Sequence, residues 1–214
     1  MPAKTTTSKR LEAMMSRAEA AMKRSAWFEA ERLSLKALEA AREVEDFDFI
    51  ARVCLPLQES RRQRMLMAID AADGVRILEH VEPEPEIEPG IIMVRPPAVA
   101  ADARRLRIAA LQQEVPIIVL TREPTNQLGL CPVVAIGRVT IRVRIEGPKN
   151  PEKPTTKWLL SSLQQLGDGA LDAIEEHASN PFYRIDSILS RLDSMPEHER
   201  MHQELAEACR ALDM

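Results

Sequence analysis

The apolar residues of this 214-residue chain recur with two different periods, and the change of period limits its possible folds more than any other feature. From residue 8 to 72 they recur every three or four positions, as on one face of a helix. Between residues 75 and 145 they alternate or form short runs bounded by proline and glycine, which predicts strands. The helical period returns after residue 155. We therefore expect an α+β protein with three parts: helices in 1–72, a small α/β sheet in 73–150, and helices in 151–214.

The first part is predicted to contain a helical hairpin followed by a third helix. Apolar residues from Leu11 to Met22 share one face of a first helix, and those from Ala30 to Val44 share one face of a second. A third helix is expected to start near Asp46. Pro56 should kink or restart it, because proline removes a helical hydrogen bond and crowds the preceding turn.

The central part is predicted to form a mixed sheet. A helix over 102–114, with Asp102 as its N-cap, separates two strands, which indicates a right-handed βαβ crossover between parallel neighbours. Gly137 and Arg138 separate the last two strands, which should form a hairpin. The predicted strands cover residues 75–81, 91–95, 117–122, 133–136 and 139–145.

Four short helices are predicted in the last part. Gly167 is typical of a helix stop, Asn180 before Pro181 of a helix start, and Ser194 with Glu197 of a capping box. The predicted helices cover residues 156–166, 168–178, 181–193 and 195–212.

The junction of the first two helices carries a recognisable order of residues. Ser25 marks the turn, Trp27 and Phe28 follow it, and two alanines seven positions apart come next. This order resembles the turn and second helix of a tetratricopeptide repeat over about one repeat, residues 11–44. It departs from that pattern at Ser25, where glycine is usual, and at Arg17, which takes an expected apolar position. The resemblance implies a partner-binding hairpin in which Trp27 and Phe28 contact the partner.

Charge and cysteine content narrow the classes of partner and compartment. The net charge is −4, and aromatic residues make up 3% of the chain, so nucleic acid is not an expected partner. Cys54, Cys131 and Cys209 are far apart and outside any CxxC motif, which favours reduced thiols and a cytoplasmic location. The aliphatic runs are too short for a membrane span.

One short motif suggests metal chemistry. His198-Glu199-Arg200-Met201-His202 matches HExxH and resembles the zincin metallopeptidase signature, in which two histidines one helical turn apart bind zinc. The charged neighbourhood favours a half-exposed structural helix instead. A zinc hydrolase is therefore the third-ranked hypothesis, with His198 and His202 as ligands and His177 as a further ligand upstream.

Two arginines suggest an anion site. Arg95 and Arg122 follow the carboxyl ends of two strands predicted to be parallel neighbours, where open α/β sheets bind ligands. If the strands are adjacent, the guanidinium groups converge beside the N-terminus of the connecting helix. The segment from Arg95 to Ala98 contains two prolines, which offer no N–H groups to a phosphate.

Three basic clusters complete the set of candidates: 61–64, 104–107 and 138–144. Each is explained by solvated helix or strand faces. An acidic protein partner or RNA is the functional alternative, and the protein partner is favoured of the two. Without a catalytic signature, the leading hypothesis is a protein–protein interaction or scaffold protein that binds protein partners or itself, with no cofactor. The alternative is a small-molecule or anion-binding domain, or an enzyme, that uses Arg95 and Arg122.

Overall fold

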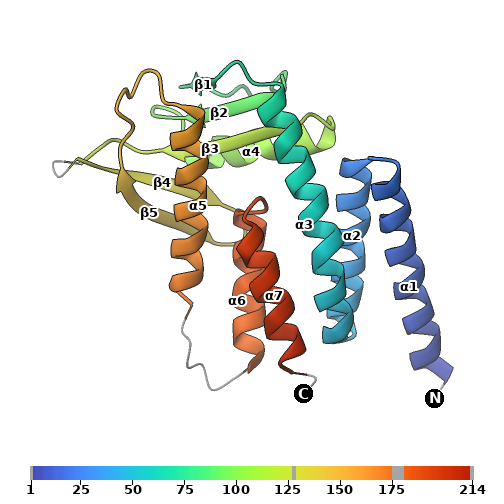
Figure 1. The fold of residues 1–214 in the computed structure, drawn as a ribbon. Coiled ribbons are helices and arrows are strands. Elements are labelled where there is room, and N and C mark those ends of the chain that lie inside the picture. The colour runs from blue at the N-terminus through green and yellow to red at the C-terminus, as the bar shows by residue number, and fades with distance from the viewer. Residues whose placement is uncertain (1, 127–128, 175–180, 213–214) are drawn as a thin grey trace.

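Three N-terminal helices pack as helical hairpins in the computed structural model, which describes residues 2–126, 129–174 and 181–212 (Figure 1). The helices are α1 (Pro2–Lys23), α2 (Trp27–Glu43) and α3 (Phe47–Asp70). The turns between them are short because Ser25 and Glu45 adopt the left-handed conformation, with φ values of 57° and 54°. The Asp46 carboxylate accepts a hydrogen bond from the Phe49 N–H at 3.0 Å, so the predicted start of α3 is confirmed.

Small residues line the contacts among these helices. Helices approach closely where the facing side chains are small, which explains why the apolar stripes of α1 and α2 are rich in alanine. The fully buried alanines of α1 and α2 are Ala18, Ala21, Ala30, Ala37 and Ala41.

Helix α3 continues through Pro56, so the predicted restart at this residue does not occur. Proline lacks the N–H that would bond to the carbonyl of Arg52, and Pro56 is itself buried. On the buried side Val53, Cys54 and Leu57 are almost fully covered. The packing of this face keeps the helix continuous despite the missing hydrogen bond.

The central part forms a five-stranded sheet in the order β1-β2-β3-β4-β5. The first three strands are parallel and the last two are antiparallel, so the predicted parallel neighbours and the hairpin are confirmed. Helix α4 (Ala100–Gln112) makes the crossover between β2 and β3. The strands are β1 (Val75–Leu78), β2 (Gly90–Val94), β3 (Ile117–Arg122), β4 (Leu130–Ile136) and β5 (Thr140–Glu146).

Helix α4 begins earlier than predicted. Its N-cap residue is Val99, and the carboxylate of Asp102 accepts a hydrogen bond from the Val99 N–H at 2.9 Å. The prediction that Asp102 is the N-cap is therefore wrong. Asp102 lies in the first turn, where a carboxylate reaches back to the chain and is stabilised by the helix dipole.

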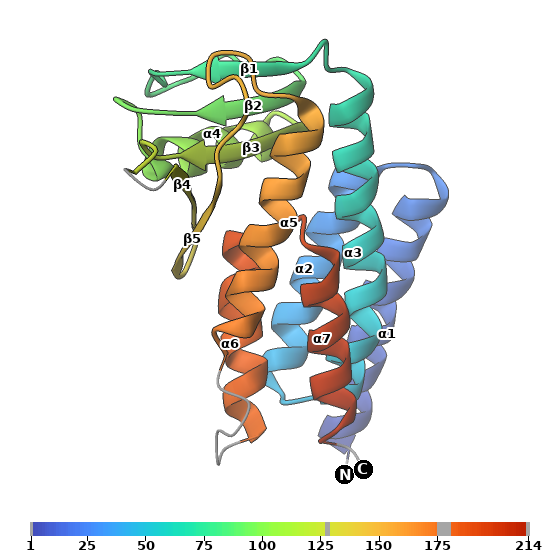
Figure 2. The ribbon, with the colours of Figure 1, turned by 60° about the vertical axis from the view of Figure 1, so that its left-hand side comes forward.

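The two faces of the sheet are covered by different helices (Figures 1 and 2). On one face Ile92, Val94 and Ile117 pack against the apolar side of α4. On the other, Ile91, Met93, Ile118 and Leu120 belong to the largest hydrophobic core, which also contains residues of α3, α5 and α7. That core draws on all three parts of the sequence.

Helix α5 (Thr156–Asp172) runs through Gly167, so the predicted stop and the separate helices at 156–166 and 168–178 are wrong. A Cβ atom at Gly167 would lie 2.2 Å from Cδ2 of His198. Glycine is needed here because an imidazole packs directly on the helix backbone. The residue makes room for a neighbour and does not end the helix.

The last two helices are α6 (Pro181–Ser194) and α7 (Glu199–Arg210). Ser194 is the final residue of α6, and its hydroxyl donates to the Val139 carbonyl at 2.7 Å. The predicted capping box is therefore wrong, and α7 begins after the N-cap residue His198. The predicted cap Asn180 and the suggested ligand His177 lie outside the described residues.

Within the part of the chain that the structure describes, no helix is both long and apolar enough to cross a bilayer. The three cysteines are buried and are not joined in disulfides.

Candidate functional site: an arginine-lined cleft

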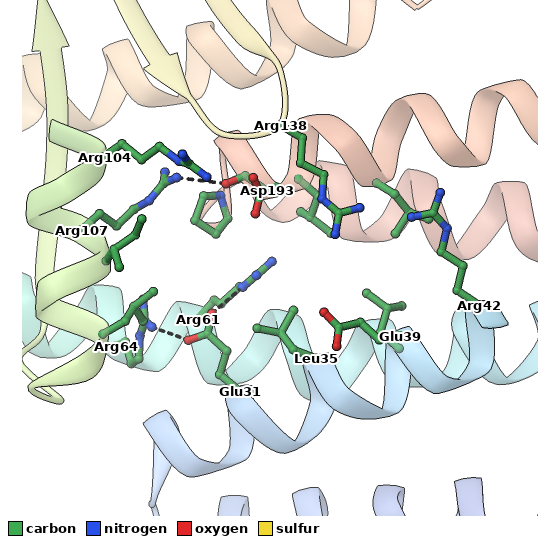
Figure 3. A pocket seen from close by; sticks show the side chains of 16 residues that line it. Glu31, Leu35, Glu39, Arg42, Arg61, Arg64, Arg104, Arg107, Arg138 and Asp193 are labelled. Carbon is green, nitrogen blue, oxygen red and sulfur yellow. Dashed lines mark hydrogen bonds and ion pairs between the residues drawn. The ribbon is translucent and has the colours of Figure 1, made fainter. Parts of the chain in front are cut away.

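A cleft of about 250 Å³ lies where the helical layer meets α4, α6 and the tip of the β4–β5 hairpin (Figure 3). It brings together residues from all three predicted basic clusters. The arginines that line it are Arg42, Arg61, Arg64, Arg104, Arg107 and Arg138.

Helical spacing explains why these side chains converge. Arg61 and Arg64 are three residues apart on α3, as are Arg104 and Arg107 on α4, so each pair shares one helix face. Arg138 stands at the turn between β4 and β5, which reaches toward α6. The sequence shows each cluster, but only the tertiary fold places them around one space.

The floor of the cleft is a buried ion-pair network centred on Glu31, whose exposed fraction is 4%. Arg61 Nε donates to one carboxylate oxygen at 2.8 Å, and Arg64 bonds to the other. The Arg64 guanidinium also lies 5.0 Å from the ring centroid of Phe28. Arg64 Nε is buried without a hydrogen-bond partner. Two buried guanidinium groups therefore share one carboxylate, which leaves a net positive charge in the floor of the cleft.

Arg107 closes the opposite wall by binding backbone. Its guanidinium donates to the carbonyl oxygens of Ser194 at 2.8 Å, Asp193 at 3.0 Å and Ile136 at 3.3 Å. Burial lowers the pKa of Arg107, and nearby carboxylates oppose this effect. None of these three bonds neutralises the charge, because carbonyl groups are dipoles and carry no net charge.

The mouth of the cleft holds exposed cations. Arg104 and Arg138 make no hydrogen bond or ion pair with any described residue, whereas Arg42 pairs with Asp186 at 2.7 Å. Three carboxylates, those of Glu31, Glu39 and Asp193, line the cleft against six arginines. The chain as a whole has a net charge of −4, so this concentration of positive charge is local.

An apolar groove continues from the cleft between α2 and α4. Leu35, Ile108 and Leu111 line both hollows, and Phe28 lines the groove, which has a volume of about 490 Å³. Ile108 and Leu111 are exposed large apolar side chains on α4. Exposed apolar surface beside a charged cleft is typical of a binding site.

The two aromatic residues predicted to contact a partner, Trp27 and Phe28, lie in different surroundings. Phe28 lies in the groove and under Arg64. Trp27, the first residue of α2, is half-buried and belongs to neither of these two hollows in the described part of the chain.

The two histidines of HExxH contact different partners. Arg61 donates to His202 Nε2 at 3.1 Å, so the other ring nitrogen carries the proton and donates to the His198 carbonyl at 3.1 Å. His198 Nε2 lies 3.1 Å from the Gln164 amide nitrogen and 3.3 Å from Asp168 Oδ1. A nitrogen that accepts a bond from arginine is not free to bind zinc. Among the described residues, no group of three metal-binding side chains suits an ion.

Burial also controls the charge of these rings. It lowers the pKa of His202 to about 3, and the neighbouring Arg61 charge lowers it further. It lowers the pKa of His198 too, against the opposing effect of Asp168. Both rings are therefore neutral at pH 7 and serve as internal hydrogen-bonding groups.

Arg95 and Arg122 stand at the carboxyl ends of the parallel strands β2 and β3, as predicted. Their side chains lie on the face that carries α5, by the alternation that places Met93 and Leu120 there. The crossover helix α4 covers the opposite face. The expected contribution of its N-terminus to an anion site is therefore not part of this arrangement.

Comparison with known proteins gave no match: no family model, no curated protein and no solved structure is significantly similar to the chain. The function has to be inferred from the site itself.

Proposed function

We propose that the protein is an interaction module that binds an acidic segment of a partner protein along the groove between α2 and α4. The carboxylates of the segment would be held by the arginine-lined cleft. The observation that carries this proposal is the convergence of six arginines from separate elements, with Arg104 and Arg138 exposed and unpaired within the described chain.

The apolar groove favours a protein segment over an isolated anion. A ligand held only by charge would not need Leu35, Ile108 and Leu111 beside the arginines. An amphipathic helix places apolar and acidic residues on adjacent faces, so it can fill the groove and reach the cleft together. Arginine is also enriched among the residues that dominate binding at protein interfaces.

The tetratricopeptide-like hairpin supports the same use of the surface. Helix α2, which carries the resemblance, supplies Phe28, Glu31 and Leu35 to the two hollows. A second copy of this chain is the alternative source of the acidic segment, and light scattering at rising concentration separates the two cases.

The charged part of the site is tested by fluorescence anisotropy. The probe is a fluorescein-labelled peptide of about 15 residues with leucines at helical spacing and glutamates between them. Combining Arg104→Glu with Arg138→Glu should weaken binding by about a hundredfold, because two attractions become repulsions. The matched control combines Arg142→Glu with Arg144→Glu, two exposed arginines of β5 outside the cleft, and changes the net charge by the same amount. Equal loss in the control would show attraction to net charge alone and would contradict the proposal.

The apolar part needs its own variant. Ile108→Ala removes an exposed side chain that lines both hollows, and binding should weaken about tenfold. Leu55→Ala is the control, since Leu55 is exposed on α3 and lines neither hollow. Unchanged affinity in Ile108→Ala would limit the ligand to the arginine cleft and exclude an apolar anchor at this position.

A further inference from the structure

The two strand-end arginines form a second cluster, separate from the cleft. Val94 of β2 and Thr121 of β3 are the last paired residues of these parallel strands. Arg95 and Arg122 are therefore next in register and point to the same face, on neighbouring strands whose backbones lie about 4.8 Å apart. Like charges carried on adjacent positions repel each other, and an anion between them relieves this repulsion.

Arg122 is only partly compensated. Its exposed fraction is 9%, it makes no ion pair with any described carboxylate, and its Nε has no hydrogen-bond partner, although its guanidinium group also interacts with the Cys131 side chain. Buried arginines normally have a carboxylate or several carbonyl partners, because an uncompensated charge away from water is unfavourable. A buried guanidinium group with an unbonded Nε and no ion pair among the described residues, at the carboxyl edge of a parallel sheet, indicates a place for a ligand.

A carboxylate of the chain already occupies part of this place. Arg95 donates to both oxygens of Glu152, each at 2.7 Å, and also binds Glu79. Arg95 lowers the pKa of Glu152, and the charge of Arg122 adds to the effect. The Glu152 side chain is 71% exposed and belongs to the connection between β5 and α5. It can leave without opening the core.

We propose that the strand ends form a binding site for a phosphate group of a small ligand, and that Glu152 acts as its built-in substitute in the free protein. Glu152 supplies one negative charge at this place and Glu79 pairs with Arg95, whereas a phosphate group in the place of Glu152 supplies close to two charges at neutral pH. Phosphate also has enough oxygens to accept bonds from both arginines. Ligand binding displaces Glu152 from Arg95 and brings the ligand's charge to Arg122.

Isothermal titration with inorganic phosphate tests this site. Removing the competitor in Glu152→Ala should tighten phosphate binding at least about tenfold relative to the unaltered protein, because an intramolecular ligand competes at high effective concentration. Glu84→Ala is the matched control, since Glu84 is an exposed acid of the β1–β2 connection. Equal affinity in the unaltered protein, Glu152→Ala and Glu84→Ala would overturn the proposal, as would the absence of binding in Glu152→Ala.

Two further variants show which residues hold the anion. In the Glu152→Ala background, Arg122→Gln and Arg95→Gln should each abolish the gained affinity. Arg95 lies outside the core, so its variant keeps the test valid if Arg122→Gln fails to fold. Acetate, with a single charge, should bind at least about tenfold more weakly than phosphate. Loss of phosphate binding should leave the acidic peptide's affinity for the arginine-lined cleft unchanged, so the two proposals fail independently.

Discussion

The role of a single residue in this chain is often set by a neighbour that is distant in sequence. Gly167 is the clearest case, because its hydrogen makes room for the His198 ring, which comes 31 positions later. A glycine in a helical sequence ordinarily suggests a helix end. Here the helix continues and the glycine serves packing between α5 and the segment before α7.

Substitution at this glycine should therefore destabilise the protein. Gly167→Ala improves helix propensity, yet the added methyl overlaps the imidazole, so the free energy of unfolding should fall by about 1–3 kcal/mol. Urea unfolding monitored by circular dichroism measures the change. The control Ser161→Ala, at an exposed position of the same helix, should change stability by less than about 0.5 kcal/mol. A stabilised Gly167→Ala would show that the ring does not pack on α5.

The buried histidine His202 predicts the response to acid. Its pKa is about 3 in the folded chain and 6.5 in the unfolded chain, so unfolding takes up a proton between these values. The stability that depends on neutral His202 should be fully present above pH 6.5. Below pH 6.5 the free energy of unfolding should fall by up to about 1.4 kcal/mol per pH unit. Denaturant unfolding at pH 7 and at pH 5 measures this loss, which should be smaller in His202→Gln. The same loss in both proteins would assign the effect to other groups.

At the cleft the Arg107 side chain joins α4 to α6 and to β4. Arg107 of α4 binds carbonyls at the C-terminus of α6 and at the end of β4, so it holds the hairpin and α6 against the crossover helix. The helix dipole adds to this contact because the last carbonyls of a helix attract cations.

Removal of this guanidinium should loosen α6 and the hairpin together. Arg107→Leu leaves three carbonyl groups without their donor, and the free energy of unfolding should fall by about 2–3 kcal/mol. Arg104→Leu, one turn earlier and exposed, should cost less than about 0.5 kcal/mol. Hydrogen exchange should increase in α6 and in β4–β5 of the first variant only. Equal stability of the two variants would mean that the carbonyls are satisfied by water.

Elements were easier to predict than their junctions. The period of apolar residues was enough to predict the N-terminal helices, the parallel pair β2–β3 and the final hairpin, because each pattern is local. Three predicted helix-end signals are wrong: Asp102 as an N-cap, Gly167 as a stop and Ser194 in a capping box. The role of each residue depends on the neighbour that it contacts, which is Val99 for Asp102, His198 for Gly167 and Val139 for Ser194. Gly167 and Ser194 serve packing and docking here, whereas Asp102 still stabilises the helix start, from inside the first turn.

At the scale of the whole molecule, the fold brings arginines from separate parts of the sequence together in one site. The sequence indicates three basic clusters and explains each as a solvated face. The structure places Arg61, Arg107 and Arg138, one from each cluster, around the same cleft. The spacing of residues in the sequence could not predict this convergence. Helices α3 and α4 and the hairpin meet only because the helical layer packs against α4 and α6. The convergence supports a binding function.

The most direct test maps the binding surface by methyl NMR during titration with the acidic amphipathic peptide. The Ile108, Leu111 and Leu35 methyl signals should shift, and those of Leu55 on the outer face of α3 should not. Shifts centred on Leu55, or binding that leaves Ile108, Leu111 and Leu35 unchanged, would contradict the assignment of the groove between α2 and α4 as the partner site.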